Sequence, residues 1–287
     1  MEISGKTKLM GLIGNPVEHT LSPVIHNTIA EHKKDNMAYM PFPVKENLDI
    51  AVKGAYALGV QGMNVTVPYK SDVMQSLVSV DEQAAIIGAV NTLVRIDGGY
   101  KGFNTDLPGL YRAMKSDGIE IKGAKVVILG AGGAARAAAF MCAFYRAAEI
   151  YILNRTVEKA NLVAVEIKDK TGFEDVIPMA LTEYDKLPGD GYLCIQATKV
   201  GLYPDVNATP MKDAQFFEKI SVVYDLIYTP EETHFMKQAK AHGIEAYNGL
   251  KMLLYQGVAA YEMWNDTMIS EDIVTIAYDA LKDGLKK

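Results

Sequence analysis

Short apolar runs alternate with amphipathic stretches along the whole chain. In roughly the first hundred residues, alternating or continuous apolar positions predict strands at 8–13, 37–44, 62–67 and 89–96. Apolar residues at helical spacing predict helices at 23–33, 47–58, 81–88 and 107–117. Asp97-Gly98-Gly99 predicts a hairpin turn that leads into a return strand. We therefore expect this part to form an α/β layer of its own, with mostly parallel strands.

The second part of the chain continues this rhythm with more strongly apolar runs. Strands are predicted at 125–129, 149–153, 176–180, 191–197 and 221–227, with a last strand near 243–247. Helices are predicted at 137–148, 157–168, 230–241, 249–264 and 270–286, and Thr229-Pro230 is expected to open the third of them. This alternation predicts a parallel sheet of the Rossmann type.

A glycine-rich turn, within the sequence KVVILGAGGAAR at 125–136, joins the first strand and helix of this second part. It matches the G-x-G-x-x-G/A pattern in the strand–turn–helix context that a dinucleotide site requires. Gly130 permits the tight turn, Gly132 lets a pyrophosphate approach the backbone, and Ala135 lets the helix pack closely on the strand. An ordinary turn that binds nothing is the alternative. The candidate cofactor residues here are Gly130, Ala131, Gly132, Gly133 and Ala134.

The end of the next strand indicates which dinucleotide is bound. An NAD site usually carries an acidic residue there for the ribose 2′-hydroxyl, whereas an arginine suits a 2′-phosphate. This chain has Asn154-Arg155-Thr156, with Lys159 about one helical turn later, and these groups could hold a phosphate. A solvated helix start would look similar, and Glu158 opposes an anion. The pattern favours NADP over NAD.

Composition describes an ordinary globular protein with room for two cores: 287 residues, 49% hydrophobic, 22% charged and a net charge of −6. The negative charge gives no reason to expect a nucleic-acid or anionic-membrane surface, so local groups must capture an anionic substrate. Cys142 and Cys194 lie in apolar runs, as expected for buried free thiols. The five histidines lack metal-ligand spacing, so no metal is expected. No signal core or membrane-length apolar run is present, and we expect a cytoplasmic protein.

Candidate substrate groups lie near the ends of predicted strands. Ser22 before Pro23 has two interpretations: an ordinary helix N-cap, or, together with Thr20, a pair of hydroxyls that bind a carboxylate at a helix N-terminus. The segment Asn64–Lys70 places polar side chains at the carboxyl end of a strand, where open α/β sheets bind ligands.

Seven sequence blocks together resemble the shikimate dehydrogenase family, in the family's order and over nearly the whole chain. The blocks are GNPVEHTLSPVIHN, GMNVTVPYK, GAVNT, GFNTD, GAGGAAR, NRT and GLKMLLYQG. The resemblance implies a substrate domain at 1–106, a Rossmann NADP domain at 107–248, and C-terminal helices at 249–287 that return to the first domain. It also implies reversible reduction of 3-dehydroshikimate to shikimate by NADPH, a step of chorismate and aromatic amino-acid biosynthesis.

The resemblance assigns roles position by position. It implies Lys70 and Asp106 at the reacting centre. The substrate-binding residues that it implies are Thr20, Ser22, Asn64, Thr66, Lys70, Asn91, Thr105, Asp106, Tyr228 and Gln256. On the cofactor side it adds Thr198, with Gly249 and Met252 near the nicotinamide end.

The chemistry of Lys70 and Asp106 follows from their side chains. A hydride transfer to a ketone leaves an alkoxide that needs a proton, and a lysine ammonium can donate it. An adjacent aspartate carboxylate keeps such an ammonium charged, so the two groups are expected to titrate as a coupled pair. The hypothesis is that Lys70 acts as the acid during reduction and as the base during oxidation. A surface lysine and a helix-capping aspartate are the alternative interpretation.

Four positions depart from the family pattern. Thr20 replaces a commoner serine, Gln196 stands for asparagine before Ala197-Thr198, and Asn248 stands where aspartate is commoner. Lys199-Val200-Gly201 looks more like quinate/shikimate dehydrogenases. A dual quinate/shikimate enzyme using NAD or NADP, a non-catalytic NADP-binding sensor, and a tetrahydrofolate-type dehydrogenase therefore remain alternatives. The protein is expected to be a monomer or homodimer.

Overall fold

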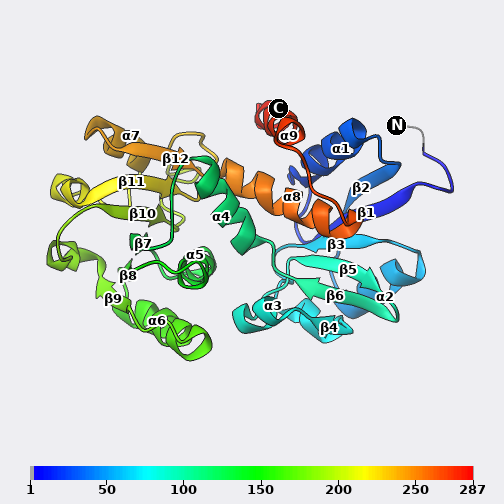
Figure 1. Ribbon diagram of the computed structural model, residues 1–287, viewed down its shortest axis with the longest axis horizontal. Coiled ribbons are helices and arrows are strands. Elements are labelled where there is room, and N and C mark those ends of the chain that lie inside the picture. Colours follow the sequence, from blue (N-terminus) through cyan, green and yellow to red (C-terminus); the bar gives the residue numbers. More distant parts are fainter. Residues whose placement is uncertain (1–2, 287) are drawn as a thin grey trace. The chain divides into compact units, whose positions relative to one another are not determined.

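The computed structural model describes residues 3–286 and divides into two compact units (Figure 1). Unit 1 contains the chain up to Gly109 and the segment that begins at Leu254. Unit 2 is Leu110–Leu253. Both boundaries lie inside helices, α4 (Asp106–Ser116) and α8 (Leu250–Asn265), so each of these helices contributes to both units.

Unit 1 is built on a six-stranded sheet with the order β2-β1-β3-β5-β6-β4. Its strands are β1 (Lys8–Gly14), β2 (Met37–Pro43), β3 (Gly62–Val65), β4 (Ser79–Val80), β5 (Thr92–Ile96) and β6 (Gly99–Phe103). Its other helices are α1 (Ser22–Lys33), α2 (Leu48–Ala57), the 3-10 helix η1 (Asp72–Ser76), α3 (Glu82–Ile87) and α9 (Glu271–Gly284). The sheet is mixed, because β5 runs antiparallel to both β3 and β6. The predicted hairpin at Gly98 is confirmed.

A close contact between β3 and α8 anchors the C-terminal segment of unit 1. Trp264 donates its indole N–H to the Leu93 carbonyl oxygen at 2.9 Å. A Cβ at Gly62 would lie 2.3 Å from the Trp264 ring, so glycine is required there. Helix α9 packs beside α1 within the same unit (Figure 1).

Unit 2 is a six-stranded parallel sheet with the order β12-β11-β10-β7-β8-β9. Its strands are β7 (Lys125–Leu129), β8 (Glu149–Asn154), β9 (Val176–Ala180), β10 (Tyr192–Gln196), β11 (Ile220–Asp225) and β12 (Glu245–Asn248). Its helices are α5 (Gly133–Phe144), α6 (Val157–Thr171), η2 (Leu181–Lys186), η3 (Ala214–Lys219) and α7 (His234–Ala241). This is the doubly wound Rossmann order, and its topological switch point lies between β7 and β10. The expected Rossmann architecture is confirmed.

Three helix starts differ from the sequence prediction. Helix α5 begins at Gly133, inside the glycine-rich turn, rather than at residue 137, where the apolar run begins. Helix α1 already includes Ser22, its N-cap is Leu21, and no side chain caps it, so Ser22 is not the cap. Helix α7 begins at His234 rather than at Thr229-Pro230, because the Thr233 hydroxyl caps it by accepting from the Met236 amide.

The two cysteines are buried free thiols, as predicted, and burial raises the pKa of Cys142 to about 12. Across residues 3–286, no helix combines the length and apolar character needed to cross a membrane.

Candidate active site

A lysine–aspartate pair marks the carboxyl end of β3 in unit 1. Lys70 lies in the turn after this strand, and Asp106 is the first residue of α4. The Lys70 ammonium lies 2.6 Å from Asp106 Oδ2, and the two side chains are 33% and 18% exposed. The pair is therefore accessible at the surface yet held in a fixed geometry, which suits proton transfer to a bound ligand.

Asn91 fixes the orientation of the Asp106 carboxylate. Its Nδ2 donates to Asp106 Oδ1 at 2.9 Å, so the two carboxylate oxygens have different partners. Its Oδ1 accepts from the Thr105 backbone N–H at 2.8 Å and from the Thr92 hydroxyl at 2.9 Å. Asn91 and Thr105 are buried, which makes these bonds strongly directional.

The main chain around the pair is tied down as well. The Val90 N–H donates to the Lys70 carbonyl oxygen at 2.7 Å. Asn104 accepts from the Asp106 N–H at 3.0 Å and donates to the Ala89 carbonyl oxygen at 3.0 Å. Both ends of the ion pair are thus bound to the segment that precedes β5.

Asn64 extends this polar network along the sheet. Its Nδ2 donates to the Asn91 carbonyl oxygen and to the Thr92 hydroxyl, each at 3.2 Å, and its Oδ1 accepts from the Tyr39 hydroxyl at 2.8 Å. Thr66, two residues later, begins the turn, and its N–H donates to the Ile13 carbonyl oxygen.

Thr20 and Ser22 lie together at the start of α1. The Thr20 hydroxyl donates to Ser22 Oγ at 3.2 Å and accepts from the Ser22 N–H at 3.3 Å. Ser22 also contacts the Tyr39 hydroxyl, whose pKa is raised by burial and lowered to a smaller extent by Ser22. Through these bonds both hydroxyls lie beside the N-terminus of α1, where an anion is favoured.

Gln256 belongs to the part of α8 in unit 1 and lies against α4. A Cβ at Gly109 would be 2.7 Å from the Gln256 backbone nitrogen, so the two helices touch at this point. Gly109 is one turn after Asp106, which brings Gln256 to the beginning of α4.

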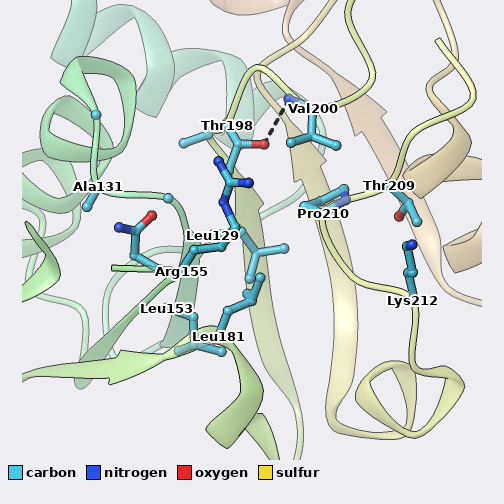
Figure 2. A pocket seen from close by; sticks show the side chains of 14 residues that line it. Leu129, Ala131, Leu153, Arg155, Leu181, Thr198, Val200, Thr209, Pro210 and Lys212 are labelled. Atoms are coloured by element: carbon cyan, nitrogen blue, oxygen red, sulfur yellow. Dashed lines mark hydrogen bonds between the residues drawn. The ribbon is translucent and has the colours of Figure 1, made fainter. Parts of the chain in front are cut away.

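Unit 2 carries a cavity of about 540 Å³ at its switch point (Figure 2). Predicted cofactor residues in its lining are Gly130, Ala131, Gly132, Asn154, Arg155 and Thr198. Gly130 has φ +111°, and a Cβ there would lie 3.0 Å from Thr198 Cγ2, so the tight turn requires glycine. Nothing lies within 4 Å of a Cβ at Gly132, the N-cap of α5, which leaves the helix N-terminus open to a phosphate.

The opposite side of this cavity comes from a segment that the sequence did not reveal. Thr209, Pro210 and Lys212 lie across the cavity from Arg155, and Leu181 closes a further side (Figure 2). The volume, the glycine turn and the two cations fit a phosphorylated dinucleotide.

Gln196 and Asp225 form hydrogen bonds that hold the segment carrying Thr198. Gln196 Oε1 accepts from the Thr198 N–H at 2.6 Å, and its Nε2 lies 3.3 Å from Asp225 Oδ1. Asp225 also accepts from the Thr233 hydroxyl at 2.7 Å, and burial raises its pKa to about 6 against the effect of these bonds. The Gln196 substitution therefore shapes the loop that carries Thr198.

The remaining predicted cofactor residues lie outside the cavity lining: Gly133, Ala134, Thr156, Lys159, Gly249 and Met252. Gly133 and Ala134 form the first turn of α5. Gly249 is forced to be glycine, since a Cβ would lie 2.3 Å from the Leu226 carbonyl oxygen. Tyr228 follows β11 in unit 2, and burial raises its pKa.

Asn248 acts as a local support at the start of α8. Its Oδ1 accepts from the Leu250 N–H at 3.1 Å, and its Nδ2 donates to the Glu231 carbonyl oxygen at 2.9 Å. An aspartate could make only the first of these bonds, so asparagine suits this position.

Comparison with known families gives two matches. Residues 12–93 match the family described as the shikimate dehydrogenase substrate binding domain, and residues 112–187 match shikimate / quinate 5-dehydrogenase. Together these matches cover more than half of the chain.

Individual relatives agree with these matches. The chain is 41% identical over 289 residues to a shikimate dehydrogenase (NADP(+)) of Methanothermobacter thermautotrophicus, covering 99% of both chains. A crystal structure of a shikimate dehydrogenase in complex with NADP+ superposes with a TM-score of 0.88 at 40% identity, covering 100% of this chain and 98% of the other. A shikimate 5-dehydrogenase from Thermus thermophilus, solved with NADP(H) and shikimate, has a TM-score of 0.83 at 33% identity, with 97% and 100% coverage.

Proposed function

The chain belongs to the shikimate dehydrogenase family, and from that membership we propose that it catalyses the reversible reduction of 3-dehydroshikimate to shikimate with NADPH as the reductant. The observation that carries the proposal is the Lys70–Asp106 pair near the carboxyl end of β3, in which Asn91 donates a hydrogen bond to the second oxygen of Asp106. When bound, NADPH supplies the hydride.

Lys70 is the proposed general acid and base in this reaction. Its ammonium donates to the oxygen that becomes the shikimate hydroxyl, and in the oxidation direction its amine takes that proton back. Asp106 holds the ammonium in place and Asn91 holds Asp106, so the donor needs no reorganisation when the alkoxide develops. The Thr105 backbone N–H donates to Asn91 Oδ1 and so fixes the Asn91 side chain.

The other proposed substrate residues hold the ring. Thr20 and Ser22 bind the substrate carboxylate beside the N-terminus of α1, and the hydroxyls of the ring are bound by Asn64, Thr66, Gln256 and Tyr228. A site built from such hydrogen bonds rejects analogues that lack the matching group, because its polar atoms are then left unpaired.

Unit 2 would hold NADP through three groups of residues. The turn at Gly130–Gly132 and the N-terminus of α5 take the pyrophosphate, whereas Arg155, with Asn154, Thr156 and Lys159, takes the 2′-phosphate. Thr198, Gly249 and Met252 are assigned to the nicotinamide end. We assign the chain boundaries of the substrate and cofactor domains to about residues 106 and 248, as the motifs indicate.

The test is a spectrophotometric assay of the purified protein with shikimate or quinate and with NADP+ or NAD+. Turnover of shikimate with NADP+, at a higher kcat/KM than any other pairing, is expected. Efficient oxidation of quinate with NAD+ would instead support the dual-specificity alternative suggested by Lys199-Val200-Gly201. Cofactor binding without turnover would support the sensor alternative and end the enzymatic proposal.

A further inference from the structure

His26 is a buried histidine that the proposed reaction does not use. It lies one turn after Ser22 on α1 and is 0% exposed. Burial lowers its pKa to about 3, so the ring is neutral, with only a small opposing influence from the nearby Asn64 side chain. Neither ring nitrogen makes a hydrogen bond of normal geometry with the described residues. A polar ring in such a position needs a reason other than hydrogen bonding.

The His26 ring packs against the ring of Tyr39 on β2, and this contact explains its position. The His26 and Tyr39 rings stack with centroids 4.2 Å apart and an interplanar angle of 16°. The Trp264 ring packs against both of these rings, with its centroid 5.0 Å from that of His26 and 6.1 Å from that of Tyr39. The Tyr39 ring therefore has little freedom to change rotamer.

The next residue of α1 holds the same tyrosine by its main chain. Asn27 Nδ2 donates to the Tyr39 carbonyl oxygen at 3.1 Å, and Asn27 Oδ1 accepts from the Tyr39 N–H at 2.9 Å. Two successive residues of α1 thus fix one residue of β2, one through its ring and the other through its backbone.

The hydroxyl of the fixed tyrosine lies among the proposed substrate residues. It donates to Asn64 Oδ1 at 2.8 Å and contacts Ser22. Because the Asn91 carbonyl oxygen can only accept, Asn64 must turn its amino group to Asn91 and Thr92, which leaves its oxygen to accept from Tyr39. The Tyr39 hydroxyl therefore holds the oxygen end of the Asn64 side chain, and its position determines where that end lies.

We propose that His26 is a positioning residue for substrate binding: its ring holds Tyr39, and Tyr39 in turn orients Ser22 and Asn64. The inference rests on the proposed function for the identity of the ligand. It requires the flat ring of His26 rather than its nitrogen atoms, and it acts on substrate affinity rather than on the cofactor.

The test compares His26→Leu, which removes the stack, with His26→Phe, which keeps a flat ring without nitrogen. For His26→Leu we expect KM and the calorimetric Kd for shikimate to rise at least about tenfold, which corresponds to about 1.4 kcal/mol. KM for NADP+ should stay within about twofold, and His26→Phe should recover most of the lost affinity. His32→Leu is the matched control, because His32 is exposed on the same helix, and its kinetics should equal the wild type.

A double-mutant cycle with Tyr39→Phe separates positioning from general destabilisation. If His26 acts through the Tyr39 hydroxyl, the double variant binds shikimate no more weakly than the weaker single variant. Additive losses would overturn the inference. Unchanged shikimate affinity in His26→Leu, or a His26→Phe variant as weak as His26→Leu, would also overturn it. Calorimetric binding keeps the two proposals distinct: a wild type that binds shikimate without turning it over contradicts the proposed function alone.

Discussion

Lys70 is the residue on which the proposed chemistry depends most. Replacing it by alanine removes the proton donor but leaves the hydroxyls and amides that hold the ring. We expect Lys70→Ala to lower kcat by about 10²–10⁴-fold, the range for loss of a general acid, with a much smaller change in KM for shikimate. Steady-state kinetics in both directions measure this.

The matched control for Lys70 is Lys53→Ala. Lys53 is an exposed lysine of the same unit and is also paired with an aspartate, Asp49, at 2.8 Å. An exposed pair of this kind contributes little, so this variant should behave as the wild type. Near-normal kcat in Lys70→Ala would contradict the role assigned to the ammonium.

His26 also predicts a pH dependence of stability at the residue scale. Its pKa is about 3 in the folded state and near 6.5 when unfolded, so the unfolded chain binds the extra proton between these values. The rings that face His26 are those of Tyr39, Tyr261 and Trp264, and burial among them keeps its ring neutral. Wild type should therefore lose stability relative to His26→Phe as the pH falls below 6.5, by about 1.4 kcal/mol per pH unit.

Urea unfolding followed by Trp264 fluorescence measures this difference, since Trp264 is the only tryptophan and lies beside His26. Above pH 6.5 the difference between the two proteins should be constant. If the difference in unfolding free energy stayed constant down to pH 4, His26 would take up its proton in the folded protein as readily as in the unfolded chain, which contradicts the prediction.

At the scale of elements, the contact of β3 with α8 predicts a strong effect of a single methyl group. In Gly62→Ala the new Cβ would lie 2.3 Å from the Trp264 ring, so the indole must move and lose its bond to Leu93. Overpacking of this kind costs about 1–3 kcal/mol. We expect a lower unfolding midpoint and a red-shifted Trp264 emission.

Gly54→Ala is the matched control for that prediction. Gly54 lies inside α2 with nothing within 4 Å of a Cβ. Alanine there should raise the free energy of unfolding by about 0.5–1 kcal/mol, because glycine is a poor helix former. Equal destabilisation by both variants would mean that the β3–α8 contact is not the cause.

The β8–α6 junction determines the expected cofactor preference. Arg155 follows β8, is exposed and lines the cavity, so Arg155→Ala should remove a charge-assisted bond to the 2′-phosphate. Losing a bond worth about 1.5–3 kcal/mol should raise KM for NADPH about 10- to 100-fold, with little change for NADH. Lys199→Ala removes an exposed cation next to Thr198 that does not line the cavity and should leave this ratio unchanged.

Elements with complete local signals could be predicted from the sequence. The β7–α5 turn carries its apolar strand, its glycines and its helix in direct succession, and the fold confirms all three. The start of α7 could not be predicted, because Thr233 caps it while bonded to Asp225, the last residue of β11. Thr229-Pro230 offered a stronger local signal at the wrong place.

The residues of the candidate site also fall into those that a local motif indicates and those that it does not. The motifs indicated Lys70, Asp106 and Asn91, which are near the ends of strands, and the structure brings them within hydrogen-bonding distance. Tyr39 and Lys212 carried no local pattern. Tyr39 reaches Asn64 only through the register of β2, β1 and β3, and Lys212 reaches the cavity from a loop far along the chain. Such placements depend on tertiary packing rather than on neighbouring residues.

At the scale of the molecule, the residues proposed to bind the two ligands form separate sets. The proposed substrate residues are in unit 1 except Tyr228, and the cavity assigned to NADP is in unit 2. Net charge is −6, so both anionic ligands depend on these local sets of cations, hydroxyls and amides rather than on the overall field. Each ligand should therefore stabilise a different part of the backbone.

Hydrogen exchange read by mass spectrometry tests this separation. Shikimate alone should slow exchange at the start of α1 and in the turn from Thr66 to Lys70, because bound ligand suppresses the local opening that exchange requires. NADP+ alone should slow exchange in the Gly130–Gly133 turn and around Thr198. At a ligand concentration of 100 times Kd, the added protection should approach about 2.7 kcal/mol. Arg155→Ala should abolish the NADP+ effect at a fixed low concentration while the shikimate effect persists. Protection of the Gly130–Gly133 turn by shikimate alone, with none near Lys70, would contradict the assignment of the two ligands to these two sets of residues.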